Sequence, residues 1–264
     1  MELELASGPA RVVIDTEHGG RLASLRVRDL ELLVNGSDSP LHWGCYPMAP
    51  FAGRVRHGRF RYSGREYQLP LNMPPHAHAG TVYDQPWKVE HVDTTDAVLI
   101  SDLGEPWPFP GRVVHRLRID DDGIDLRLEV WAEDEPFPAS CGWHPWWRRR
   151  LSRGQPVHLD LAAGAMWARD EDGLPSGDLT SPPPGPWDDC FTDLQAPPRL
   201  RWEDAIEVTV ESTCMDLVVF DQPSHAVCVE PQTGPPDGLR LTPLVVEPGL
   251  PLVAEAAFRW ELLA

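Results

Sequence analysis

Apolar and polar residues alternate along most of the chain with the two-residue period of half-buried β-strands. In residues 112–134, two alternating runs flank an Asp-Asp-Asp-Gly turn at 120–123, which predicts an antiparallel hairpin. Residues 11–34 and residues 58–71 each contain two such runs around a glycine turn, which predicts two more hairpins. Further strands are expected within residues 96–103, 156–164, 206–213, 216–222, 226–232 and 251–263.

Proline and glycine separate these runs. The chain has 29 prolines and 21 glycines, and because proline removes a helical hydrogen bond, no helix of three turns is expected. Many short strands with turns between them are typical of a large antiparallel β-sandwich or barrel. Residues 170–190 are predicted to be a proline-rich surface loop and not a linker, because strands of the same character continue on both sides. We therefore expect an all-β fold in one domain over residues 1–264.

The acidic composition narrows the choice of partners. The net charge is −18 at pH 7 and the pI is about 4.8, so most of the surface would repel a nucleic-acid backbone. No apolar run approaches the roughly 20 residues that a membrane-spanning helix needs. Residues 1–10 lack the basic and apolar parts of a secretory signal. We expect a cytoplasmic protein with no nucleic-acid or membrane partner.

The cysteines do not form a pattern that binds metal or frames a fold. They are odd in number and none has C-x-x-C spacing, so we expect reduced, mostly buried thiols. The five lie at positions 45, 141, 190, 214 and 228.

Candidate chemistry begins in residues 48–87, which contain Arg54, His76 and His78. Two histidines at i and i+2 on an extended chain point the same way. That spacing can hold a metal ion, but a catalytic metal site needs a third ligand of matched type, and the nearby acidic residues have no signature spacing. We therefore predict no metal. For any single histidine here, a solvated loop residue is the simpler interpretation.

A second candidate stretch is SCGWHPWWRRRL at residues 140–151. Pro145 holds His144 extended, so this histidine is expected at a strand end or turn with a fixed backbone. The neighbouring Trp146 offers a flat apolar face of the kind on which sugar rings stack, although a tryptophan cluster in the core is a serious alternative. The arginines at 148–150 are most simply a solvated face, and a phosphate clamp is the sharper alternative.

The third stretch is HAVCVEPQTGPPDG at residues 225–238. Ala226, Cys228 and Glu230 share one face of the predicted strand. A carboxylate that is partly desolvated at a strand end has a raised proton affinity, which suits a general base. A solvated glutamate at the end of the strand is the alternative.

Six segments, in this order, resemble motifs of the aldose 1-epimerase (galactose mutarotase) family. Together they span almost the whole chain, which makes the resemblance specific for the superfamily and less so for the substrate. The segments are PFAGRVRHGRFRYSGREYQLPLN (50–72), HAHAGTVYDQPW (76–87), PWPFPGRVVHRLRI (106–119), CGWHPWW (141–147), WDDCFTDL (187–194) and CVEPQTGPPDG (228–238).

The resemblance implies a galactose mutarotase-like supersandwich that interconverts the α and β anomers of a free hexose without a metal or organic cofactor. A base removes the proton of the anomeric hydroxyl while an acid protonates the ring oxygen, and the ring opens and recloses. Glu230 would be the base. His144 would be the acid, kept protonated by nearby carboxylates. Arg54 and Asp188 fall on family positions that hold sugar hydroxyls.

The sequence departs from the family pattern at one position. The resemblance implies a second histidine in the site, directly before a glycine. Counted back from Pro86-Trp87, that histidine falls on Ala79, and His78 is one residue early. One residue on a strand is a change of face, unless a bulge re-aims the chain. Either His78 or His76 takes the role after a local backbone shift, or the position is lost. We expect retained activity because the acid and base positions are present.

Two other functions stay open at this point. The Ala79 departure allows a non-catalytic carbohydrate-binding protein on the same scaffold. The arginine-rich segments allow a hexose-6-phosphate mutarotase. In all three cases the partner is a small-molecule sugar, and the chain is expected to be a monomer or a homodimer.

Overall fold

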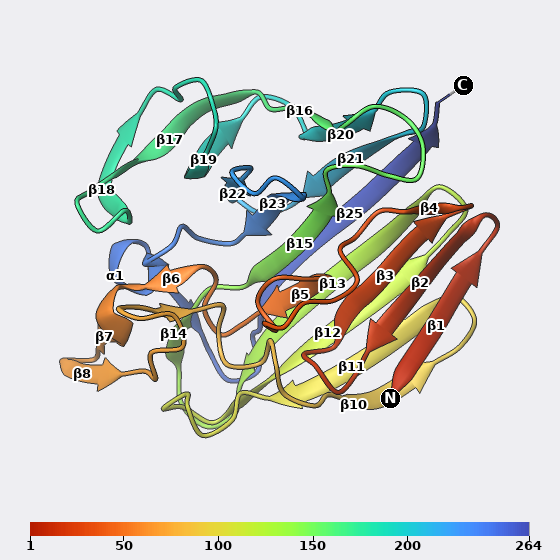
Figure 1. Ribbon diagram of the computed structural model, residues 1–264. Coiled ribbons are helices and arrows are strands. Elements are labelled where there is room, and N and C mark those ends of the chain that lie inside the picture. Colours follow the sequence, from red (N-terminus) through yellow and green to blue (C-terminus); the bar gives the residue numbers. More distant parts are fainter. Residues whose placement is uncertain (264) are drawn as a thin grey trace.

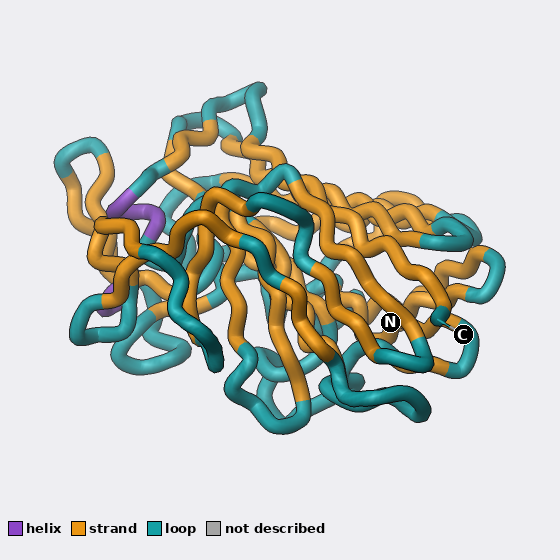
Figure 2. Tube along the Cα trace, turned by 90° about the horizontal axis from the view of Figure 1, so that it is seen from above, coloured by secondary structure: helices purple, strands orange, loops and turns teal. Residues whose placement is uncertain are grey.

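A computed structural model of the protein describes residues 1–263, in which strands form two large antiparallel sheets and three small ones. Figure 2 shows how strands dominate the molecule and how the two short helical turns lie together at one end. These turns are a 3-10 turn, η1 (Arg56–Gly58), and a single α-helical turn, α1 (Gly238–Leu241). The prediction that no helix reaches three turns is thus confirmed for residues 1–263. No helix in this part of the chain is long and apolar enough to cross a membrane.

The larger sheet has eleven strands in the order β1-β2-β3-β5-β15-β23-β22-β19-β17-β18, with β4 beside β3 (Figure 1). Neighbouring strands are antiparallel, and the candidate chemistry lies near the middle of this order. The strands are β1 (Glu2–Ser7), β2 (Ala10–Asp15), β3 (Arg21–Val27), β4 (Leu30–Glu31), β5 (Cys45–Met48), β15 (Gly142–Arg148), β17 (Ala163–Arg169), β18 (Pro175–Thr180), β19 (Asp188–Leu194), β22 (Asp216–Phe220) and β23 (Ala226–Gln232).

The second sheet has eight strands in the order β10-β11-β12-β13-β25-β21-β20-β16. The alternation read from the sequence is clear in β13, where Ile124, Leu126 and Leu128 are buried while Asp125 and Arg127 are more exposed. The strands are β10 (Lys88–Val92), β11 (Asp96–Asp102), β12 (Gly111–Ile119), β13 (Gly123–Ala132), β16 (His158–Asp160), β20 (Arg199–Trp202), β21 (Ile206–Ser212) and β25 (Leu252–Leu262).

The two large sheets pack face to face around one apolar core that takes residues from both. A buried hydrogen bond also joins them, because the Trp143 indole on β15 donates from Nε1 to His115 Nε2 on β12 over 3.1 Å. This arrangement confirms the predicted β-sandwich.

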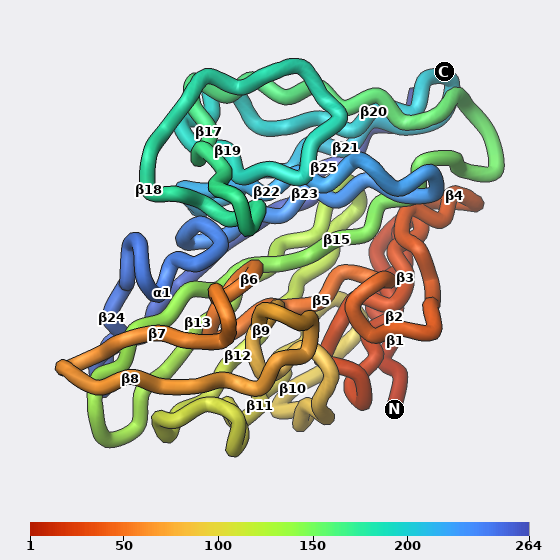
Figure 3. The backbone as a smooth tube through the Cα atoms, turned by 60° about the vertical axis from the view of Figure 1, so that its left-hand side comes forward, coloured from red at the N-terminus to blue at the C-terminus, as the bar shows by residue number. Residues whose placement is uncertain are grey.

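Three two-stranded sheets complete the fold, and one of them lies beside the candidate chemistry. Figure 3 shows β6 and β9 in front of β5 and β15. Ala52 and Ala79, which flank β6 and β9, share a small apolar cluster with buried residues of β5 and β15. The pairs are β6 (Arg54–Val55) with β9 (Ala77–His78), β7 (Arg59–Tyr62) with β8 (Arg65–Gln68), and β14 (Phe137–Ala139) with β24 (Leu244–Val246).

Two local predictions are wrong. Residues 170–190 are not a single loop, since they contain β18 and the start of β19. Strand β18 is an edge strand that is mostly exposed, so its sequence lacks the apolar alternation that reveals a strand. His144 does not end a strand but lies inside β15. The β15–β23 ladder pairs Gly142 and then Trp146, and this interruption accommodates Pro145, which has no N–H to donate.

Candidate active site

A cavity of about 180 Å³ opens against the middle of the larger sheet. It is smaller than the roughly 300–1,000 Å³ of pockets that bind drug-sized ligands, which suits a ligand of about one sugar ring. Strands β15, β23, β22, β19 and β17 supply one side of its lining. Arg54 on β6 and His78 on β9, which are paired in register, supply part of the other side. Gly173 and Leu174, in the turn between β17 and β18, and Pro175, the first residue of β18, supply more of it.

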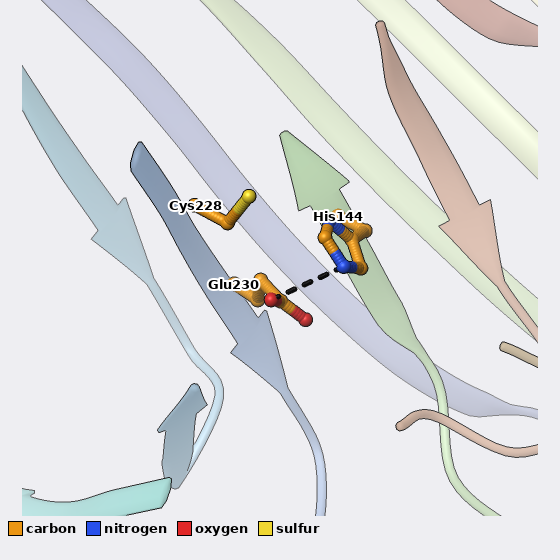
Figure 4. Close-up of side chains that lie close together, drawn as sticks. All are labelled: His144, Cys228 and Glu230. Carbon is orange, nitrogen blue, oxygen red and sulfur yellow. Dashed lines mark ion pairs between the residues drawn. The ribbon is translucent and has the colours of Figure 1, made fainter. Parts of the chain in front are cut away.

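His144 and Glu230 meet at the base of this cavity. His144 Nε2 lies 3.3 Å from Glu230 Oε1, and the residues are 5% and 3% exposed. Figure 4 shows the two side chains reaching toward one another from the neighbouring strands β15 and β23. The fold therefore brings together the two residues that the sequence named as acid and base, although they are 86 positions apart (230 − 144).

Two aromatic rings fix the plane of the His144 imidazole. Tyr46 stacks on it with ring centroids 4.9 Å apart, and Trp146 stacks at 5.4 Å with the planes 9° from parallel. Both aromatic side chains are anchored in turn, because the Tyr46 hydroxyl and Trp146 Nε1 donate to the Leu41 carbonyl oxygen over 3.1 and 2.9 Å. The imidazole is therefore held in one orientation toward Glu230.

The environment of Glu230 favours a protonated carboxyl. Burial raises its pKa well above the ordinary value, and the nearby Asp188 carboxylate adds to the rise. Arg54 and a hydrogen bond from Gln232 Nε2, at 3.3 Å from Glu230 Oε2, act in the opposite direction. The balance agrees with the raised proton affinity predicted for this glutamate.

The environment of His144 favours a neutral imidazole. Burial lowers its pKa well below the ordinary value, and repulsion from His78, His42 and Arg54 lowers it further. The expectation that carboxylates keep His144 protonated is therefore wrong for this site. The loss of water is the main cause, and the facing Glu230 carboxyl does not oppose it because burial favours its protonated form.

Arg54 and Asp188, the predicted sugar-hydroxyl ligands, lie side by side in the cavity lining. Arg54 Nη1 is 3.6 Å from Asp188 Oδ2, and Arg169 Nη2 approaches the same oxygen to 3.7 Å. Arg169 also lies 3.7 Å from Asp189. The guanidinium groups in the cavity are thus partly neutralised by carboxylates.

His78 reaches the cavity in spite of its shifted place in the sequence. Its ring centroid lies 6.2 Å from that of His144, with the planes at 88°. Beyond it, Ala79 and Gly80 adopt left-handed backbone conformations with φ of 63° and 79°. A Cβ on Gly80 would lie 2.0 Å from the Ala49 carbonyl oxygen, so only glycine fits there. Because a histidine was expected at position 79, His78 needs a local change in backbone direction to face the cavity. The left-handed conformations of Ala79 and Gly80 are such a change.

His76 does not line the cavity. Its Nδ1 accepts a hydrogen bond from the His57 backbone N–H over 3.2 Å, and the two imidazoles are 5.5 Å apart. His76 pairs with Met73 across a tight turn and runs directly into β9, so of the two histidines only His78 lines the cavity. Nor do the arginines at 148–150 line it, since Arg148 and Arg149 donate to backbone carbonyl oxygens elsewhere.

Trp146 lines the cavity as predicted, but it is only 4% exposed. Several lining residues were not named by the sequence analysis. Trp167 and Arg169 lie outside the motif segments, and strand pairing brings them to the cavity, whereas Gln232 lies within the segment 228–238 but was not singled out. Four polar or aromatic examples are His42, Trp167, Arg169 and Gln232.

Three buried side chains at the base of the cavity could offer ligand atoms to a metal ion. Atoms of His144, Cys228 and Glu230 lie within 4.8 Å of one another (Figure 4). Metal binding needs a thiolate, and burial raises the pKa of the Cys228 thiol well above its ordinary value, which disfavours that form. The group is better described as an acid–base pair beside a protonated thiol.

A larger hollow of about 900 Å³ lies on the outer face of the eight-stranded sheet. Its charged side chains are mostly paired, for example Arg127 with Glu255 and Arg118 with Asp96. No buried acid–base pair faces this hollow, so the cavity at His144 and Glu230 is the candidate active site.

A profile of the aldose 1-epimerase family matches residues 1–237. Two Escherichia coli K12 proteins of uncharacterized activity are similar to this chain. YphB is 28% identical over 134 residues, which are 49% of this chain and 44% of YphB. YihR is 26% identical over 185 residues, 66% of this chain and 59% of YihR. The chain thus matches about half the length of these relatives.

Solved structures share the fold over nearly the whole chain at low identity. A candidate aldose 1-epimerase of E. coli K12 has a TM-score of 0.87 at 20% identity, covering 100% of this chain and 99% of its own. A galactose 1-epimerase of Lactobacillus acidophilus NCFM has a TM-score of 0.83 at 16% identity, covering 100% and 95%. At these identities the likeness establishes the fold alone.

Proposed function

Since the chain belongs to the aldose 1-epimerase family, we propose that it interconverts the α and β anomers of a free hexose by opening and reclosing the sugar ring. The observation that supports this most directly is the buried pair of His144 and Glu230, 3.3 Å apart at the base of a cavity sized for one sugar ring. Ring opening needs one group that accepts a proton and one that donates a proton, and this pair contains both.

The pair holds one exchangeable proton. A protonated Glu230 with neutral His144 differs from an ion pair only by transfer of that proton. In the neutral form, His144 Nε2 accepts the proton of the anomeric hydroxyl while Glu230 protonates the ring oxygen. The C1–O5 bond breaks and C1=O forms. After rotation about C1–C2, the hydroxyl at C5 returns its proton to Glu230 and attacks C1 while the imidazolium protonates the carbonyl oxygen.

Each group therefore accepts a proton once and donates a proton once in every turnover. The opposite starting form, with Glu230 as base and His144 as acid, is the one that the family resemblance implies. The raised pKa of Glu230 and the lowered pKa of His144 favour the neutral form as the starting point.

The other polar groups of the cavity suit an uncharged sugar. We propose that Arg54, Asp188 and His78 hold its hydroxyl groups, since a carboxylate accepts and a guanidinium donates hydrogen bonds to hydroxyls. Because Arg54 and Arg169 both lie close to Asp188, neither is free to neutralise a phosphate. A free hexose is therefore favoured over its 6-phosphate.

Glu230→Gln and His144→Asn should each lower the rate of mutarotation by at least about 100-fold, because each removes one of the two proton-transfer groups. The rate is followed by polarimetry of freshly dissolved α-D-glucose and α-D-galactose, with the 6-phosphates as competing substrates. His91→Asn is the matched control, since His91 is exposed on β10 and remote from the cavity.

Unchanged rates in both variants would refute the assignment of the pair. Sugar binding by calorimetry without any acceleration by the unaltered protein would instead identify a non-catalytic carbohydrate-binding protein.

A further inference from the structure

Asp216 is a buried carboxyl group that the proposed reaction does not use. It lies on β22 and is 6% exposed, and no lysine or arginine pairs with it among residues 1–263. Burial raises its pKa to about 6, against a hydrogen bond from Trp167 that lowers it. A buried carboxyl without a cation is unfavourable unless its hydrogen bonds compensate, so its partner deserves an explanation.

Its main partner is the indole of Trp167, because the Cys190 thiol approaches the same carboxyl oxygen only to 4.0 Å. Trp167 Nε1 donates to Asp216 Oδ1 over 2.7 Å. Trp167 is on β17 and Asp216 on β22, and β19 lies between these strands. Neighbouring strands are about 4.8 Å apart, so the indole must extend across β19 to reach the carboxyl. The hydrogen bond from Nε1 thus fixes the indole of Trp167 against the larger sheet, where this sheet lines the cavity.

The two tryptophans of the cavity differ in what they can offer a ligand. Trp146 is 4% exposed and parallel to two other rings, those of His144 and His225, so it has almost no free surface. Trp167 is half-buried, lines the cavity, and has no aromatic ring stacked on it among the described residues. Only Trp167 therefore presents an open indole to the cavity.

We propose that Trp167 is the surface on which the sugar ring packs, and that Asp216 is a positioning residue that holds its indole in place. This inference rests on the proposed function, since it concerns the same cavity. A pyranose ring has a face of C–H groups, and burying that face against an indole is favourable. The ligand class is accordingly an uncharged pyranose with an unsubstituted C–H face.

Trp167 lies away from the reacting atoms. Strand β17 is separated from β23, which contains Glu230, by both β19 and β22. The indole extends across β19 and ends at Asp216 on β22, one strand short of Glu230, so we place it against the part of the sugar that is turned away from the anomeric carbon. Such a contact is the same before and after ring opening, so its loss should raise KM and leave kcat unchanged.

The test compares KM and kcat for α-D-glucose and α-D-galactose in four variants. Trp167→Leu should raise KM about tenfold, because it removes the stacking surface. Asp216→Leu should raise KM about threefold or more, because the indole N–H loses its acceptor. Asp216→Asn retains an acceptor oxygen of the same shape, so it should stay within about twofold of the unaltered protein.

Trp131→Leu is the matched control. Trp131 is another half-buried tryptophan whose Nε1 donates to a carboxylate, Glu129 Oε2 at 3.0 Å, but it lies on the other sheet. It should not change KM. Thermal unfolding of each variant identifies any that fails to fold. If Asp216→Leu fails to fold, the comparison of Trp167→Leu with Asp216→Asn still tests the proposal.

The outcomes separate this inference from the proposed function. An active protein whose KM is unaffected by Trp167→Leu, or in which kcat alone falls, would overturn the inference and leave the function intact. If the protein binds sugar but does not accelerate mutarotation, the same comparison is made with dissociation constants from calorimetry. Weaker binding by Trp167→Leu then supports the inference although the proposed function has failed, and absence of binding to either sugar refutes both.

Discussion

His144 is one residue on which three influences converge. Tyr46 and Trp146 set the plane of its ring, burial and neighbouring positive groups keep it neutral, and Glu230 faces its Nε2 atom. An imidazole that is already oriented before substrate arrives loses little freedom on reaction, which is the condition for efficient proton transfer. The sequence predicted which residue would do this, but it did not predict the residue's charge.

The directions of the two pKa shifts predict an unusual pH profile. The active form has one proton on the pair. It is lost only above the raised pKa of Glu230, and a second proton is added only below the lowered pKa of His144. We therefore expect kcat/KM to show no fall centred near pH 6.5, where an ordinary histidine titrates. Stopped-flow polarimetry at half-unit intervals measures this. A fall centred near pH 6.5 in the unaltered protein would contradict it.

At the scale of elements, the β17–β18 hairpin forms one wall of the cavity. Ion pairs outside the cavity hold its turn in place. Arg56, in η1, pairs with Asp170, Asp172 and Asp237, and the first two lie in the turn of the hairpin. Single exposed ion pairs contribute little, but a guanidinium shared by three carboxylates forms a network that can order a short segment. The network links the hairpin to α1 through Asp237, which flanks that turn.

Arg56→Ala should loosen this hairpin, because it leaves the carboxylates in its turn without their cation. We expect trypsin to cleave after Arg169 about tenfold faster, since local opening governs such cleavage. Mass spectrometry of the fragments over time measures the rate. Arg61→Ala, which removes an exposed arginine of β7 outside the network, should leave the cleavage rate as it was. Equal rates in the two variants would mean that packing and not the network holds the hairpin.

The hairpin also marks the limit of what the sequence could predict about elements. Strands such as β13 were predictable because one face is buried and the other is wet, which produces alternation. Strand β18 has the sequence PSGDLT, is exposed at the sheet edge, and owes its conformation to pairing with β17. The same applies to Trp167 and Gln232, whose places in the cavity follow from strand order. Arg54, His144 and Glu230 were candidates from the local pattern, whereas Asp188 and the role of each residue were accessible only because family motifs surround them.

At the scale of the whole molecule, the hydrogen bond between Trp143 and His115 joins the two sheets inside the core. Such a bond contributes about 0.5–1.5 kcal/mol, and it places a titratable group where water cannot reach. Burial lowers the pKa of His115 to about 3. In the unfolded chain an ordinary histidine binds a proton below about pH 6.5. The unfolded state therefore binds more protons between these values, and the free energy of unfolding falls as the pH falls from 6.5 toward 3.

His115→Gln should reduce this acid sensitivity, since glutamine can still accept the Trp143 N–H but does not titrate. The expected difference is about 2 kcal/mol less loss of stability between pH 7 and pH 5 than in the unaltered protein. Urea unfolding at the two pH values measures it. His91→Gln, at an exposed histidine of β10, should retain the original loss. If His115→Gln loses as much stability as the unaltered protein, His115 titrates normally in the fold.

The left-handed pair Ala79–Gly80 has a consequence for how such a protein can evolve. A turn of this kind can absorb a one-residue slip, because the backbone reverses its local sense and re-aims the side chain before it. The imidazole of His78 lines the cavity although it stands one residue before the position at which the family resemblance places a histidine. Within a lineage, disappearance of a histidine from one column is therefore compatible with its persistence in space. Insertions and deletions at this turn can leave the cavity unchanged, although an alignment of the sequences then lacks a histidine at the expected position.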